Sequence, residues 1–137
     1  MRKSTLRCRS GHGYGRCRET ERAITEHSVR RSEVSQVTNI AFIRARSGRS
    51  EELGRRLLDL VVPSRQEPGC INYDVHRSDI DADLWCVYEN WRSADDLAAH
   101  FDLPHMRAFV ADVPELVDGD LDLRRFLMMS EPAPWRL

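Results

Sequence analysis

The sequence lacks the features that would place it in several large classes of protein. No run of about 18 apolar residues occurs in the chain of 137 residues, which excludes a membrane-spanning helix. Glycine is sparse and forms neither a phosphate-binding loop nor the G-x-G-x-x-G turn of a dinucleotide fold, and no nucleophile elbow is present. We therefore expect no flavin or nicotinamide bound by a Rossmann unit.

Cysteine is also scarce, and its spacing does not indicate a metal site. The four cysteines, Cys8, Cys17, Cys70 and Cys86, include no Cys-x-x-Cys pair and no spacing typical of zinc sites. Cys70 and Cys86 lie among strand-forming apolar residues, where a free thiol usually acts as a small hydrophobic side chain. A disulfide or a reactive thiol is the alternative. Reduced thiols and the absence of a metal cluster favour a cytoplasmic protein without a metal.

Charge is unevenly distributed along the chain, although the net charge is only −1. Residues 1–36 hold nine Lys and Arg against four Glu, whereas the remainder holds twelve Lys and Arg against eighteen Asp and Glu. The basic segment has no aromatic residue besides Tyr14 and too few large apolar residues to offset its ordering entropy. We predict a disordered extension over residues 1–36 that neither binds nucleic acid nor acts as a secretory signal, one domain over residues 37–132, and a short tail over residues 133–137.

The first half of the predicted domain contains a strand, a helix and a hairpin. Residues 37–45 are rich in β-formers and precede a Ser-Gly turn, which predicts a strand. Leucines at helical spacing follow, and Pro63 is expected to kink or end this helix before the turn at residues 67–69. Residues 71–76 alternate between apolar and polar types, and residues 84–91 again favour a strand, so the two segments predict an antiparallel hairpin.

The second half of the domain is expected to contain a broken helix and a last strand. Ser93 is followed by Asp96 three residues later, a capping pattern that indicates a helix start. Pro104 is expected to begin a second helical segment, which Gly119 ends, and residues 121–129 favour a strand. The order β-α-β-β-α-β predicts an α+β fold of the ferredoxin-like type with an antiparallel sheet.

Bulky residues are predicted on both faces of this sheet. In the strand over residues 84–91, Trp85 and Trp91 share one face, whereas Leu84 and Tyr88 share the other. Helices that cover one face leave the second face open, and a second copy of the chain could cover it. We therefore predict a homodimer with twofold symmetry.

A small group of polar and aromatic residues is expected to face the space between sheet and helices. They are Asn39 on the first strand, Tyr73 or His76 on the second, Trp91 at the end of the third, His100 on the helix and His105 beyond Pro104. His100 lies at the border of the predicted buried face, where an imidazole could remove a proton from a phenol or an activated carbon. The alternatives are a histidine that only hydrogen-bonds a backbone carbonyl, and a tryptophan that only packs in the core.

Four short motifs, taken in order, resemble the antibiotic biosynthesis monooxygenase family. They are E-P-G-C-I-N-Y (Glu67 to Tyr73), V-Y-E-N-W (Val87 to Trp91), A-A-H-F (Ala98 to Phe101) and L-P-H-M (Leu103 to Met106). The likeness covers roughly residues 37–132, and its specificity comes from the order and separation of the motifs. Members of this family form a dimeric α/β barrel from two ferredoxin-like units, so the resemblance implies the same assembly here.

The resemblance also implies a function: a cofactor-independent monooxygenase that oxidises a quinol, an anthrone or a related polyketide-like aromatic with dioxygen. Such a protein lowers the free energy needed to deprotonate its substrate, and the substrate anion then reduces dioxygen. The implied catalytic residues are His100, Trp91 and Asn39. The implied substrate-binding residues are His105, Tyr73, His76, Glu89 and Phe101. The match at His76 is partial, because the polar and tyrosyl partners of that histidine correspond here to Val87 and Leu97.

Other functions remain open at this point. An isomerase of a small phosphorylated dione would need basic residues at the mouth of its site, for which Arg44, Arg107 and Arg124 are candidates, although lone arginines usually lie on solvated surface. A non-catalytic dimer that binds small molecules is a second alternative. A haem-degrading relative would need its iron ligand at the position of Val110, so haem binding in that manner is not expected.

Overall fold

The computed structural model describes residues 35–133, so residues 1–34 of the predicted extension over residues 1–36 and residues 134–137 of the predicted tail lie outside the described part of the chain. The elements are, in order, β1 (Val37–Arg44), α2 (Ser50–Asp59), α3 (Val61–Arg65), β2 (Cys70–Arg77), β3 (Leu84–Trp91), α4 (Ala94–Asp102), α5 (Pro104–Leu116) and β4 (Asp122–Leu127). The predicted β-α-β-β-α-β order is confirmed, and each helical segment is divided in two.

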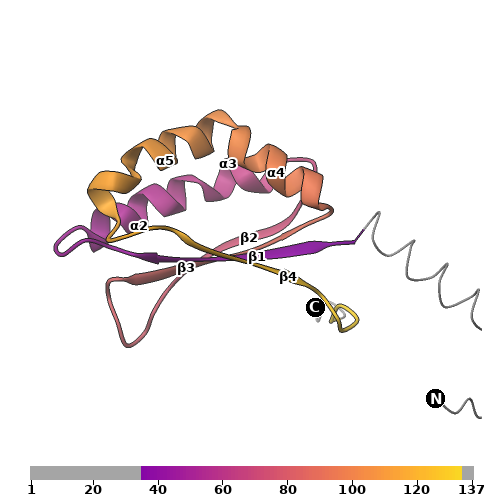
Figure 1. The fold of residues 1–137 in the computed structure, drawn as a ribbon, viewed down its shortest axis with the longest axis horizontal. Coiled ribbons are helices and arrows are strands. Elements are labelled where there is room, and N and C mark those ends of the chain that lie inside the picture. The colour runs from indigo at the N-terminus through magenta and orange to yellow at the C-terminus, as the bar shows by residue number, and fades with distance from the viewer. Residues whose placement is uncertain (1–34, 134–137) are drawn as a thin grey trace, which may run out of the picture. The chain divides into compact units, whose positions relative to one another are not determined.

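The four strands form one antiparallel sheet in the order β2-β3-β1-β4. All four helices lie on one face of this sheet, so the domain has two layers (Figure 1). This arrangement is the ferredoxin-like α+β fold expected from the sequence. Among residues 35–133, no helix combines the length and the apolar character needed to cross a membrane.

The hydrophobic core lies between the two layers. Its members come from alternate positions of the strands and from the inward faces of the helices, and include Ile43, Trp85, Val87, Trp91, Leu53, Leu57, Leu97, Met106 and Phe109. The indole of Trp85 packs directly over Gly54 of α2, where a Cβ atom would lie 2.5 Å from the ring. The Trp85 Nε1 also donates a hydrogen bond of 2.9 Å to the Ser50 hydroxyl, which fixes the ring in this place.

The ends of the helices follow from proline and capping chemistry. α2 ends at Asp59 because the ring of Pro63 would clash with the carbonyl four residues earlier, so the expected break falls just before the proline. Pro63 then occupies the first turn of α3, where a missing N–H is tolerated. The Ser93 hydroxyl accepts a hydrogen bond from the Asp96 N–H at 3.1 Å, which confirms the predicted cap of α4.

The strand boundaries differ from the prediction at a few residues. β1 ends at Arg44, and Ala45 forms only an isolated bridge with Val117. β2 carries an irregularity in its pairing with β3 between Cys70 and Asn72. As a result Ile71, which was expected to share the buried face of Tyr73, is 52% exposed. β4 is shorter than the predicted segment over residues 121–129.

The sheet face opposite the helices has no covering layer among the described residues (Figure 1). Cross-strand neighbours on this face include Phe42 with Cys86 and Ile40 with Tyr88. Phe42, Ile40 and Cys86 are only partly buried, and Tyr88 is 36% exposed. The bulky residues predicted for both faces are therefore present, and one set of them remains accessible.

Candidate active site

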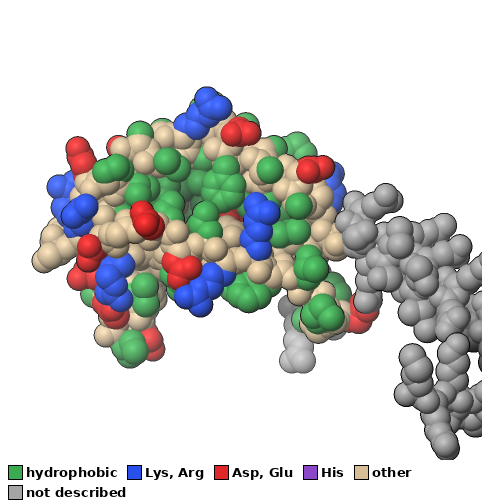
Figure 2. All heavy atoms as spheres, in the orientation of Figure 1, with side chains coloured by type: hydrophobic (Ala, Val, Ile, Leu, Met, Phe, Trp, Pro, Cys, Tyr) green, Lys and Arg blue, Asp and Glu red, His purple; other side chains and the backbone are tan. Residues whose placement is uncertain are grey.

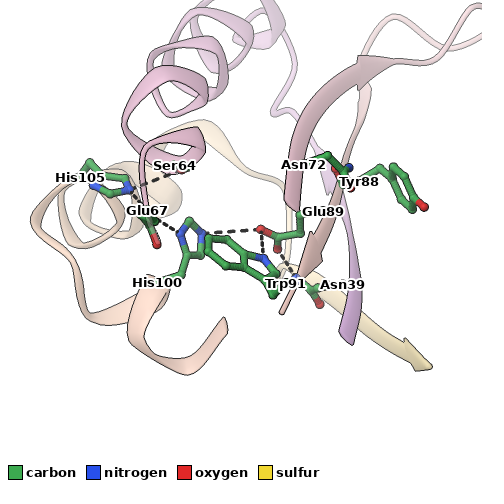
Figure 3. Close-up of polar contacts among 9 residues, drawn as sticks. All are labelled: Asn39, Ser64, Glu67, Asn72, Tyr88, Glu89, Trp91, His100 and His105. Carbon is green, nitrogen blue, oxygen red and sulfur yellow. Dashed lines mark hydrogen bonds and ion pairs between the residues drawn. The ribbon is translucent and has the colours of Figure 1, made fainter. Parts of the chain in front are cut away.

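His100 lies at the centre of a polar group enclosed by the two layers. Its side chain comes from the last turn of α4 and is completely buried, so its expected position at the border of the buried face is wrong. The Nδ1 atom lies 2.8 Å from the Oε1 atom of Glu67, which belongs to the turn between α3 and β2. Nε2 has no hydrogen-bond partner and points away from Glu67 (Figure 3).

Glu67 also contacts His105, at the start of α5. The His105 Nε2 lies 2.9 Å from the same Oε1 atom and 3.4 Å from the Ser64 hydroxyl of α3. The His105 side chain is 21% exposed, whereas that of Glu67 is 9% exposed. One carboxylate oxygen therefore links a buried imidazole to one that reaches the surface (Figure 3).

A second carboxylate, that of Glu89 on β3, lies on the other side of His100. Its Oε2 atom is 3.7 Å from the His100 Nε2 and accepts a hydrogen bond from the Trp91 Nε1 at 3.1 Å. Its Oε1 atom accepts a hydrogen bond from the Asn39 amide at 2.5 Å. Loss of solvation on burial raises the pKa of Glu89, although the hydrogen bonds and the nearby His100 oppose this change.

Aromatic rings surround the imidazole of His100. The rings of Trp91, Phe101 and Tyr73 have their centroids 4.7, 5.3 and 5.5 Å from it. The pKa of the Tyr73 hydroxyl is raised above its usual range, chiefly by burial, so this residue stays protonated and can only donate or accept a hydrogen bond. The apolar walls exclude water, and an electrostatic interaction is stronger in such surroundings.

A cavity of about 30 Å³ adjoins these residues between the sheet and the helices. Its lining combines the polar group with apolar side chains of the core and of the β4 edge: Asn39, Glu89, His100, Tyr73, Phe101, Val87, Phe109, Leu121 and Leu123 are among them. The space-filling view shows a hollow lined by hydrophobic side chains between the helical layer and the edge of the sheet (Figure 2). The volume admits a water-sized molecule.

The structure brings together seven of the eight residues singled out from the sequence. Asn39, Tyr73, Glu89, His100 and Phe101 line the cavity, whereas Trp91 and His105 contact members of that lining. His76 is the exception. It is exposed and pairs with Cys86 on the open face of the sheet. Residues 73 and 76 are separated by an odd number of positions, so a strand places them on opposite faces, and the expected role of His76 in binding is not supported.

Glu67 and Ser64 are the members of the group that the sequence reasoning missed. Ser64 carried no signal, and Glu67 was interpreted only as the first residue of the turn over residues 67–69 and of the motif E-P-G-C-I-N-Y. The pairing of Cys70 with Trp91 offers a signal, because it places the turn before β2 beside the end of β3 and the start of α4. A carboxylate in that turn is thus within reach of a histidine on α4.

The arginines considered as ligands for the phosphate group of an isomerase substrate lie outside the candidate site. Arg44 forms an ion pair with Asp81 at 2.9 Å, and Arg124 forms one with Asp122 at 2.7 Å. Arg107 is exposed on α5, and none of the three arginines lines the cavity. Val110, the position at which a haem ligand would be needed, is 48% exposed.

The fold is a two-layer, ferredoxin-like α+β domain. Its candidate site consists of a buried histidine and two carboxylates between the layers. The chain belongs to the antibiotic biosynthesis monooxygenase family, whose model matches residues 36–112, more than half of the chain. This finding confirms the family suggested by the four sequence motifs.

Similar proteins come from several bacteria. The solved structure of PA3566 from Pseudomonas aeruginosa is 32% identical, with a TM-score of 0.67, over 70% of this chain and 96% of that one. Rv0793 from Mycobacterium tuberculosis is 28% identical, with a TM-score of 0.68, over 72% of this chain and 100% of that one. YcnE of Bacillus subtilis, provisionally assigned as a monooxygenase, is 28% identical over 62% of this chain and 90% of its own length.

A further relative is the uncharacterized protein sll1783 of Synechocystis, which is 31% identical over 82 residues. The match covers 60% of this chain but 56% of sll1783, so this chain spans little more than half the length of that relative.

Proposed function

We propose that this protein is a cofactor-independent monooxygenase that oxidises a quinol, an anthrone or a related aromatic compound with dioxygen, and that His100 is its base. One observation carries the proposal: the buried imidazole has its Nδ1 beside the Glu67 carboxylate at 2.8 Å, while its Nε2 has no hydrogen-bond partner. This arrangement favours the tautomer with the proton on Nδ1, which leaves the Nε2 lone pair free to accept a proton.

Two carboxylates flank the imidazole of His100. When Nε2 accepts a proton, the imidazolium lies between Glu67 at one nitrogen and Glu89, 3.7 Å from the other. Asn39 and Trp91 hold the Glu89 carboxylate in place through their hydrogen bonds, so they are positioning residues in this mechanism.

The proposed reaction conserves atoms and electrons without another oxidant. His100 Nε2 takes a proton from the methylene group of an anthrone, or from a quinol hydroxyl in the case of a quinol. For the anthrone, the carbanion gives electrons to dioxygen and forms a C–O bond, which produces a peroxide. The O–O bond then breaks as the carbon loses its second hydrogen as a proton, and the leaving oxygen takes up both protons, the first returned by His100 and the second released from the carbon. A methylene group and dioxygen thus become a carbonyl group and water.

The test is oxygen uptake by the purified, metal-stripped chain with a panel of hydroquinones and anthrones. We expect uptake coupled to quinone formation in the wild type. The variant His100→Gln, which cannot act as a base, is expected to lose activity by about 10²- to 10⁴-fold. His76→Gln is the matched control, because His76 lies on the sheet face opposite the cavity; with its assembly state checked by light scattering, it should retain wild-type activity.

Each other outcome contradicts a separate part of the proposal. Uptake no faster than the spontaneous reaction with every substrate would exclude the monooxygenase and leave the isomerase or a non-catalytic binding dimer. Normal uptake by His100→Gln would keep the reaction but remove His100 as the base. Uptake that disappears when metal is removed and returns with it would contradict cofactor independence.

We further propose that the protein acts as a homodimer in the cytoplasm, without partners other than its aromatic substrate and dioxygen. The accessible hydrophobic residues on the open sheet face support the dimer, because a second copy would bury them. The free thiols of Cys70 and Cys86 fit a reducing compartment. The isomerase receives less support, since Arg44 and Arg124 are paired with carboxylates outside the cavity.

A further inference from the structure

The side chains of Glu67, His100 and His105, which contact one another, have the donor atoms to bind a metal ion as well as to transfer a proton. The His100 Nδ1, one carboxylate oxygen of Glu67 and a ring nitrogen of His105 all lie within 4.8 Å of one another. Two imidazole nitrogens and one carboxylate oxygen form a donor set that zinc accepts in sites with three protein ligands, where water completes the coordination. The donor set therefore suits a divalent transition-metal ion.

Two of the three distances between these atoms are close to what such an ion requires. The contacts of Glu67 with the two histidines measure 2.8 and 2.9 Å, as expected for hydrogen bonds. Ligand atoms around a tetrahedral zinc ion, with bonds of about 2.0–2.1 Å, lie roughly 3.4 Å apart. The two contacts need to lengthen by only about half an ångström, and the partly exposed His105 side chain has room to move.

The surroundings of the second ring nitrogen of His100, Nε2, give independent support for a metal ion on Nδ1. Its Nε2 is buried without a hydrogen-bond partner, and the nearest acceptor is the Glu89 Oε2 at 3.7 Å. A metal ion on Nδ1 would fix the ring proton on Nε2, which then points at that carboxylate. A carboxylate behind a metal-bound imidazole is the usual means of orienting such a ligand. Asn39 and Trp91 already hold Glu89 in this position (Figure 3).

An ion can reach this group from outside without crossing the cavity. His105 forms part of the wall of a surface pocket of about 190 Å³ between α2 and α5, together with Asp59 and Asp112. Asp112 is paired with Arg56, whereas Asp59 adds negative charge to the same pocket. The metal-bound water would occupy the exposed side of the group, next to His105.

We propose that Glu67, His100 and His105 bind one divalent ion of the zinc type, through Oε1, Nδ1 and Nε2. Binding at this site does not depend on the proposed oxygenase activity. The two properties exclude each other at His100, because a metal-bound ring that carries its only proton on Nε2 cannot accept another. If the proposed function holds, the metal-bound chain is therefore an inactive form of the enzyme.

The first experiment titrates the full chain, stripped of metal, with Zn²⁺ in a calorimeter and counts the ions bound per chain. Glu67→Gln and His105→Gln each remove one ligand, and His76→Gln removes an exposed histidine far from the site. We expect each ligand variant to lose one bound ion per chain or to bind it on the order of 100-fold more weakly. The control should bind zinc as the wild type does, and ions bound elsewhere on the chain cancel in the comparison.

Two further measurements keep the result independent of protein folding and of activity. Circular dichroism confirms that the variants fold, and His105→Gln is the safer variant because its side chain is partly exposed. With Co²⁺ in place of Zn²⁺, the wild type should show the visible absorption of a site with nitrogen and oxygen ligands, and a folded His105→Gln should lose it. Equal stoichiometry and affinity for zinc in the wild type and both folded ligand variants would overturn the proposal.

Oxygen uptake then separates this proposal from the proposed function. Zinc should suppress any uptake by the wild type, and a chelator should restore it. Uptake that continues while the site is shown to be filled would contradict the assignment of His100 as a ligand. If no substrate gives uptake at all, the proposed function fails, whereas the calorimetric difference between the wild type and the ligand variants still decides the metal site.

Discussion

A single oxygen atom of Glu67 connects the two histidines of the site. Its contacts at 2.8 and 2.9 Å join the consecutive helices α4 and α5 to the turn before β2, and Glu67 lies 33 and 38 residues before the two histidines. Because His100 is fully buried, this carboxylate determines which ring nitrogen carries the proton. In the reaction that we propose, Glu67 acts through His100 by holding the proton on its Nδ1.

Cys70, three residues after Glu67, provides a prediction for a single side chain. Partial burial, with a smaller contribution from the charge of Glu67, raises the pKa of its thiol to about 11 from the usual 9.0. Near pH 8 this thiol should therefore contain about a hundredfold less reactive thiolate than an ordinary cysteine. Its alkylation by iodoacetamide, followed by peptide mass spectrometry, should accelerate about tenfold per pH unit up to pH 10. A reference thiol such as N-acetylcysteine should level off earlier, and a Cys70 that does the same would contradict the prediction.

The sequence identified the histidines and aromatic residues of the site but not their geometry. His100 and Trp91 carry chemical signals that can be recognised without a structure, and the four motifs placed them in a family. Glu67 was missed because its partners are 33 and 38 residues away, and no periodicity within one element indicates such contacts. His76 was included wrongly, since a strand alternates and Tyr73 already occupied the inward face.

At the scale of the helices and strands, the contact of α2 with β3 leads to a prediction for Gly54. Alanine favours a helix by about 1 kcal/mol over glycine, but an added Cβ at residue 54 would lie 2.5 Å from the Trp85 ring. Overpacking of a core costs about 1–3 kcal/mol, and Trp85 cannot easily move because Ser50 accepts its hydrogen bond. We expect Gly54→Ala to lower the free energy of unfolding by about 1–2 kcal/mol, measured by urea denaturation.

The control for this prediction is Arg55→Ala, at the neighbouring exposed position of the same helix. It gains helix propensity without a contact in the core, so its stability should stay within about 0.5 kcal/mol of the wild type. A Gly54→Ala protein more stable than the wild type would mean that helix propensity outweighs the clash and that the two layers adjust.

The order of the elements was predictable because each local signal agreed with the others. Ser93 with Asp96 and Pro104 mark helix starts through local chemistry, and both signals are confirmed; α5 ends at Leu116, before Gly119, which adopts a positive φ in the segment that leads to β4. The exposure of Ile71 was not predictable, because it depends on an irregularity between β2 and β3 rather than on alternation along one strand. The end of β4 likewise depends on its pairing with β1, which local propensity does not reveal.

At the scale of the whole molecule, the open sheet face leads to a prediction about assembly. Tyr88 lies on β3, within the face that we propose to be the dimer interface, and is 36% exposed. A lysine there would be solvated in a single chain but buried in a dimer, where an unpaired charge is strongly unfavourable. We expect Tyr88→Lys to shift the mass measured by light scattering from twice 15.9 kDa towards 15.9 kDa, with unchanged circular dichroism.

A suitable comparison is Val62→Lys, which adds the same charge to the helical layer, where Val62 is 64% exposed. This variant should keep the mass of the wild type. A wild type that is already a single chain at micromolar concentration would contradict the dimer, and so would a Tyr88→Lys protein with twice the mass of one chain.

The cavity beside His100 is large enough for one of the two proposed substrates but too small for the other. Its volume of about 30 Å³ accommodates a molecule as small as dioxygen, whereas a cavity of about 150 Å³ is needed for a single benzene ring. Dioxygen therefore fits beside the base without rearrangement of the lining, but an aromatic ring can enter only when side chains such as Phe101 and Leu123 move aside. If the proposed function holds, turnover should therefore be limited by the side-chain motion that admits the aromatic substrate rather than by the concentration of dioxygen.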